Sequence, residues 1–149
     1  MIQTTNLPKV TVRREIKAPA DELFDAWLDP ASLAVWMRPG DISHSVAQVD
    51  PKIGGAFEIV MHNAGGPIVH SGEYRIIERP RRLVFTWISA GTKQTQSLVT
   101  VDFNAGRRTT EVVLTHEQLP DDNAVQAHTK GWTRILEMLA RQFGAAETH

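Results

Sequence analysis

Apolar and polar residues alternate near the start of the chain, with Arg14 as the one break in the apolar face. Over residues 9–17 this period of two predicts a half-buried strand. Pro19 then suits the first turn of a helix. That helix should end where Asp29 precedes Pro30, because a residue before proline is disfavoured in the helical region. A second short helix is predicted over residues 30–36, so one strand is followed by two short helices.

The middle of the chain repeats a pattern of strand and turn. Turns rich in Gly, Pro and Asn separate stretches that favour extended structure. The predicted strands cover residues 43–50, 56–62, 68–78, 82–89, 95–104 and 108–116. Because the connections are short, consecutive strands should be antiparallel neighbours.

Near the end of the chain the apolar spacing changes to three and four, which predicts a long helix over residues 121–143. Asp121 or Asp122 can cap it. Gly131 costs such a helix about 1 kcal/mol relative to alanine, so it indicates a closely approaching strand or an opening beside the helix. The apolar face is formed by Val125, His128, Trp132, Ile135, Leu136, Leu139 and Phe143.

These elements predict one α+β domain over residues 1–149. A sheet of about six to seven strands cannot stay flat, because strands twist. We expect it to curl around the C-terminal helix, with the two short helices after the first strand, as in a helix-grip fold. A curled sheet and a helix often leave a cavity between them.

Composition excludes several classes of function. The 149 residues carry a formal net charge of −1 and no cysteine. Balanced charge gives no long-range attraction to nucleic acid, and a chain without cysteine has no thiolate nucleophile or cysteine metal site. We find no apolar run long enough for membrane insertion and no signal peptide, so we expect a cytoplasmic protein.

The order of elements, with several local segments, resembles the START and birch-pollen-allergen-like superfamily, also called SRPBCC or polyketide cyclase-like. Within it, the chain is similar to bacterial single-domain relatives of the C-terminal domain of the heat-shock protein 90 ATPase activator. The segments that carry the resemblance are 18–27 (APADELFDAW), 33–36 (LAVW), 54–57 (GGAF), 72–76 (GEYRI), 80–87 (PRRLVFTW), 110–116 (TEVVLTH) and 131–132 (GW). The resemblance implies a cavity for a hydrophobic molecule.

We therefore predict a noncatalytic binding or carrier domain for a small hydrophobic or lipid-like molecule. One alternative is a cyclase- or hydrolase-like enzyme that uses the same cavity, with His128 or an inward-facing acid as its base. A second is a protein-interaction module that resembles the chaperone activator; the chain could be a monomer or a homodimer. The predicted ligand-binding residues are Trp36, Met37, Phe57, Ile59, Met61, Tyr74, Trp87, Val99, Val101, His116, His128, Trp132 and Ile135.

The histidines leave two interpretations open. His128 and His116 could each contact a ligand, or each could be a buried residue bonded to nearby backbone. His62 and His70 flank one hairpin turn, but a metal site there would need a third ligand such as Glu58. We predict no metal and no cofactor, and the sequence holds no P-loop or nucleophile-elbow motif.

Overall fold

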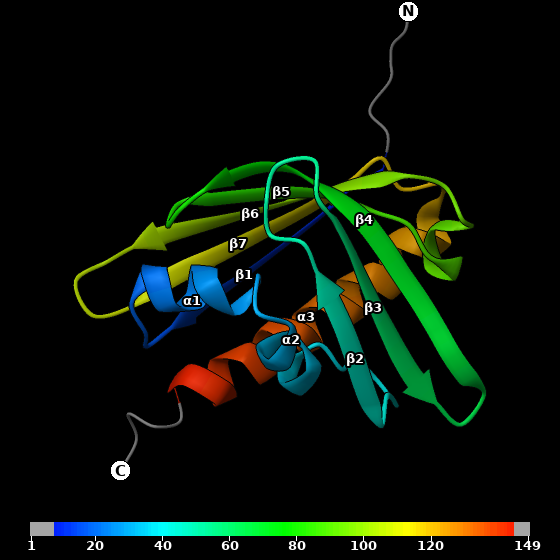
Figure 1. Ribbon diagram of the computed structural model, residues 1–149, viewed down its shortest axis with the longest axis horizontal. Helices are drawn as coiled ribbons and strands as arrows, with labels where there is room; N and C mark the ends of the chain where they lie inside the picture. The colour runs from blue at the N-terminus through cyan, green and yellow to red at the C-terminus, as the bar shows by residue number, and fades with distance from the viewer. Residues whose placement is uncertain (1–7, 145–149) are drawn as a thin grey trace, which may run out of the picture.

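Seven strands form a single curled sheet in the computed structural model, which describes residues 8–144 (Figure 1). Their order across the sheet is β1-β7-β6-β5-β4-β3-β2, and all neighbouring strands are antiparallel. The strands are β1 (Val10–Ile16), β2 (His44–Val49), β3 (Ala56–Asn63), β4 (Gly66–Glu78), β5 (Arg82–Trp87), β6 (Ser97–Ala105) and β7 (Thr110–Glu117).

Three α-helices lie within or beside the hollow of this sheet. The long helix α3 (Asp122–Gly144) occupies the hollow, and the short helices α1 (Ala20–Ala26) and α2 (Pro30–Trp36) close it on the other side (Figure 1). The start of α2 is fixed locally, because the Asp29 carboxylate accepts a hydrogen bond from the Ala31 amide at 3.0 Å. None of the helices in the described residues is long and apolar enough to cross a bilayer.

The sheet bends sharply in the middle of β4. Before the bend β4 pairs with β3, and after it with β5, with a register shift between Tyr74 and Ile76. Gly72 lies at this corner, where a Cβ atom would stand 1.9 Å from the Thr86 carbonyl oxygen and 2.6 Å from the Phe57 ring. Only glycine lets the strands approach this closely. The bend sets the ribbon β2–β3–β4 apart as one wall of the hollow.

Aromatic side chains dominate the core beneath α1 and α2. Trp27 packs against Trp36 with ring centroids 4.7 Å apart, and its indole also faces Trp132 at 6.3 Å. Phe24 meets Phe103 edge to face at 5.3 Å. These contacts fill the end of the hollow where the C-terminal half of α3 runs, so any open space must lie nearer its N-terminal half.

The predicted helix-grip architecture is confirmed, with elements in the predicted order. Several boundaries shift by two or three residues: α1 ends at Ala26, before the expected end at Asp29, and β7 begins at Thr110 instead of residue 108. Other shifts surround the segment after β5. There the expected strand 82–89 stops at Trp87, and a 3-10 turn over Ala90–Thr92 delays the next strand to Ser97. Thr92 hydrogen-bonds to the Ser89 and Thr95 carbonyls, and these side-chain bonds replace strand pairing.

Candidate functional site

A cavity of about 540 Å³ lies between the N-terminal half of α3 and the wall formed by β3, β4 and β5. It opens to solvent beside exposed residues of α3 and the loop that follows α2. Its volume is within the range of about 300–1,000 Å³ that is usual for small-molecule sites. The lining residues are Pro39, Gly40, Met61, Ile68, His70, Trp87, Ser89, Ala90, Gly91, Ala127, His128, Lys130, Gly131, Trp132, Arg134 and Ile135.

The space exists because α3 carries small residues where it faces the sheet. Gly131 has no side chain, and a Cβ atom added there would meet only Pro39, at 3.8 Å. The neighbouring Trp132 and Ile135 are buried and form the apolar wall on the helix side. The opening that Gly131 indicated in the sequence is therefore present.

The sheet supplies the opposite wall. Met61 of β3, Ile68 of β4 and Trp87 of β5 point inward, and the capped turn after β5 closes one end. In that turn Ser89 accepts a hydrogen bond from the Gly91 amide at 3.1 Å. Trp87 lies 5.1 Å from Trp132 between ring centroids, so the two indoles enclose the inner end of the cavity.

His116 belongs to a closed hydrogen-bond network behind the cavity. The Trp132 indole N–H donates to His116 Nδ1 at 2.9 Å, which places the histidine proton on Nε2. Nε2 in turn donates to Ser97 Oγ at 2.7 Å, and that hydroxyl donates to the Trp87 carbonyl at 2.7 Å. Burial lowers the pKa of His116 to about 3, so this ring is neutral. The network holds both cavity tryptophans in place.

His128 lies on the cavity surface, half-buried. Its Nδ1 donates to the Ala124 carbonyl at 2.8 Å. Burial lowers its pKa, so Nε2 is an unprotonated acceptor at neutral pH. The backbone interpretation is confirmed for Nδ1, whereas Nε2 belongs to a side chain that lines the cavity.

His70 is the second histidine of the lining, and its ring centroid lies 5.1 Å from that of Trp87. Burial lowers the pKa of His70 to about 4, so this ring is also neutral. Its Nδ1 and the Trp87 indole nitrogen are buried without a hydrogen-bond partner among the described residues. The inner wall therefore contains buried nitrogen atoms without hydrogen-bond partners, whereas both ring nitrogens of His116 are hydrogen-bonded.

The structure separates the thirteen predicted ligand-binding residues into three groups. The five that line the cavity are Met61, Trp87, His128, Trp132 and Ile135. Met37, Phe57, Ile59 and Tyr74 surround, with Trp87, a void of only about 10 Å³. Tyr74 lies outside the cavity, and burial raises the pKa of its hydroxyl. Trp36, Val99, Val101 and His116 are fully buried packing residues.

Sequence reasoning missed the small and polar part of the lining. Ile68 and His70 lie two residues apart on β4, so they share a face, and that spacing was the available signal. Pro39 and Gly40 belong to the loop that follows α2. Lys130 and Arg134 carry no apolar signal, because both are charged and lie off the predicted apolar face of the helix.

The hypothetical metal site at the β3–β4 hairpin does not form. The register pairs His62 with Pro67 and His70 with Ile59, so the two histidines lie on opposite faces. His62 instead stacks on His44, with ring centroids 4.2 Å apart. The described residues contain no group of three potential metal ligands.

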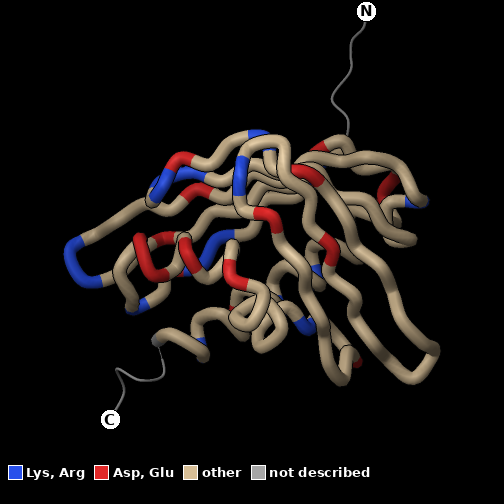
Figure 2. Tube along the Cα trace, viewed as in Figure 1, with Lys and Arg blue, Asp and Glu red and all other residues tan. Residues whose placement is uncertain are grey.

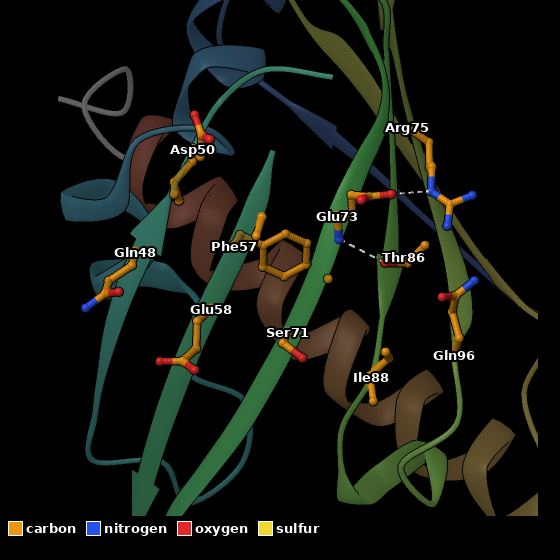
Figure 3. A pocket seen from close by; sticks show the side chains of 13 residues that line it. Gln48, Asp50, Phe57, Glu58, Ser71, Glu73, Arg75, Thr86, Ile88 and Gln96 are labelled. Atoms are coloured by element: carbon orange, nitrogen blue, oxygen red, sulfur yellow. Dashed lines mark hydrogen bonds and ion pairs between the residues drawn. The ribbon is translucent and has the colours of Figure 1, made fainter. Parts of the chain in front are cut away.

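A second hollow, of about 780 Å³, lies on the outer face of the sheet at the β4 bend. Figure 3 shows that its side chains, among them Gln48, Glu58, Ser71 and Gln96, come from β2 to β4 and from the segment around β5. Its one arginine, Arg75, is bonded to Glu73 at 3.1 Å. This hollow is larger than the cavity beside α3, and its lining mixes polar side chains with the apolar Val49, Phe57 and Ile88.

A curled sheet that grips a long helix, with an apolar cavity beside that helix, defines a helix-grip domain of the ligand-binding type. Residues 17–144 match the family model described as "Activator of Hsp90 ATPase homolog 1-like protein". The match covers most of the chain, so the protein belongs to this family. A search of curated protein sequences gave no match.

Solved structures share the fold. CV1439 from Chromobacterium violaceum is 21% identical, with a TM-score of 0.81 over 91% of this chain and 96% of that one. PFC0360w, an Hsp90 activator from Plasmodium falciparum, is 28% identical, with a TM-score of 0.69 over 87% and 91%. CalU16 from Micromonospora echinospora is 24% identical, with a TM-score of 0.68 over 90% and 73%.

Proposed function

We propose that this protein binds a small, predominantly apolar molecule in the cavity beside α3. The observation that carries the proposal is the cavity itself, at about 540 Å³, walled by Trp87, Trp132, Met61 and Ile135. Burying a ligand's apolar surface against these side chains supplies roughly 25 cal/mol per Å², before the costs of ordering. His128 Nε2 adds one directional contact for a ligand hydroxyl.

Nuclear magnetic resonance titration tests this proposal. Labelled protein would be titrated with a panel of fatty acids and alcohols, sterols, flavonoids and phospholipids. We expect saturable shifts at the Trp87 and Trp132 indole N–H signals for at least one class. The Trp36 indole, which donates to Ser32 Oγ in the core, serves as an internal control and should move less. A well-folded protein with no shift at Trp87 or Trp132 would contradict the proposal.

Interaction with an Hsp90-type chaperone is a second candidate function. It is supported by family membership, by the Plasmodium neighbour, and by an exposed apolar row across β2, β3 and β4. In that row Val46 and Val69 are 51% and 48% exposed, with Val60 between them. We expect added protein to raise the ATPase rate of a purified Hsp90, and Val46→Ser/Val69→Ser to reduce that effect. An unchanged rate at saturating protein would exclude this candidate.

A further inference from the structure

The charged side chains that line the apolar cavity are both basic. Lys130 and Arg134 belong to α3, and no aspartate or glutamate is among the described lining residues. Their spacing of four residues places them one turn apart on the same face of the helix. Both are exposed, so they flank the opening of the cavity while its interior stays apolar.

These two cations are weakly engaged within the protein. None of the seven ion pairs in residues 8–144 involves Lys130. Arg134 meets only Glu137, on the same helix, at 3.8 Å, with both side chains more than 40% exposed. Such a surface pair contributes little. By contrast, Arg79 and Arg82 each bond an aspartate at 2.8 and 2.7 Å. The charges at the opening are therefore free to meet a ligand.

The interior of the cavity and its opening differ in how they receive an anionic ligand group. Inside, His128 presents an acceptor nitrogen, because its Nδ1 proton is held by the Ala124 carbonyl. An acceptor disfavours an anionic group at that depth, where an unpaired charge is also costly to bury. At the opening, Lys130 and Arg134 offer only donors and positive charge. An acidic group is thus disfavoured inside and favoured at the opening.

We infer that the ligand is an acidic amphiphile, with its apolar body between Trp87 and Trp132 and its anionic head beside Lys130 and Arg134. This inference rests on the proposed function, since it needs an occupied cavity. It adds the chemical class of the ligand and the direction in which the ligand enters. A long-chain carboxylate is the simplest molecule that meets both requirements.

Two ligands of equal chain length test the inference. Decanoate and decanol would be titrated against the protein near neutral pH, with tryptophan fluorescence as the readout. We expect Lys130→Gln/Arg134→Gln to weaken decanoate binding roughly tenfold, as expected for two exposed charge contacts, and to change decanol binding less than about twofold. Raising the salt concentration should weaken decanoate binding to the unmodified protein, but it should not weaken decanoate binding to the Lys130→Gln/Arg134→Gln variant.

A matched variant controls for net charge. Arg107 and Arg108 lie in the β6–β7 turn, the basic segment at the far left of Figure 2, and line a different hollow. Arg107→Gln/Arg108→Gln removes the same charge and should leave decanoate binding within about twofold. Charge reversal, Lys130→Glu/Arg134→Glu, should transfer preference to decyltrimethylammonium.

The outcomes separate this inference from the proposed function. If decanol binds and the Lys130→Gln/Arg134→Gln variant binds decanoate as tightly as the unmodified protein, the acidic head is wrong and the cavity remains a binding site. An equal loss of decanoate binding in the Arg107→Gln/Arg108→Gln variant would also overturn the inference. If neither decanoate nor decanol binds the unmodified protein, the inference is wrong, and so is any version of the proposed function in which the ligand is aliphatic.

Discussion

Replacing Gly131 by leucine should abolish ligand binding while the protein stays folded. Gly131 faces the cavity, and a Cβ atom there meets only Pro39, at 3.8 Å. A leucine side chain therefore has room to enter the space that the ligand would occupy. We expect decanol affinity to fall at least tenfold, because the apolar contacts of the ligand with Trp87 and Trp132 are lost. Tryptophan fluorescence titration measures this directly.

Two companion variants make the result interpretable. Gly131→Ala adds one methyl group and should raise the free energy of unfolding by roughly 0.5–1 kcal/mol, since glycine weakens a helix interior. Gln126→Leu places leucine on the exposed side of α3, away from the lining, and should bind decanol normally. Unchanged binding by a folded Gly131→Leu variant would show that the ligand sits elsewhere.

The architecture could be predicted because local signals agreed with one another. The helix predicted to begin at Pro30 does begin there, and the structure adds an N-cap by Asp29. The change from alternating to three-and-four spacing located α3 over nearly its full length. Where side chains compete with backbone, as Thr92 does after β5, the apolar pattern contained no warning and the strand boundaries shifted.

The cavity was harder to predict, because a cavity is defined by missing volume. Val99 and Val101 face the same side of the sheet as the lining residues, yet they are fully buried. They belong to one core cluster with buried residues of α1, α2 and α3. Apolar periodicity identifies which residues point inward but not which of them meet a neighbour. Gly131 was informative because an absent side chain is visible in the sequence.

Register decided the roles of the histidines. His62 and His70 looked equivalent on either side of a turn, but the two-residue turn at 64–65 places them on opposite faces. His116 and His128 share the inner side, with ring centroids 4.6 Å apart, yet only His128 reaches the cavity. The partner of His116, Ser97, lies 19 residues away on another strand and has no local signature.

Acidification should unfold this protein steeply, beginning below about pH 6.5. Burial holds the pKa of His116 at about 3 and that of His70 at about 4 in the folded protein, against about 6.5 when unfolded. Between these values the unfolded chain binds protons that the folded protein does not. Stability is therefore complete above pH 6.5 and declines as pH falls. His116 alone contributes a slope of about 1.4 kcal/mol per pH unit, and His70 and His128 add to it in the same direction.

Urea unfolding at several pH values between 7 and 4.5 would measure this slope. His116→Gln should lower it by about 1.4 kcal/mol per pH unit, because the titrating group is gone. Ser97→Ala breaks the same network without removing the histidine. It should cost about 1–3 kcal/mol at every pH and keep the original slope. A His116→Gln variant with the slope of the unmodified protein would mean that His116 becomes protonated while the protein is still folded. The network around Trp132 would then loosen before unfolding, and the cavity would lose its inner wall first.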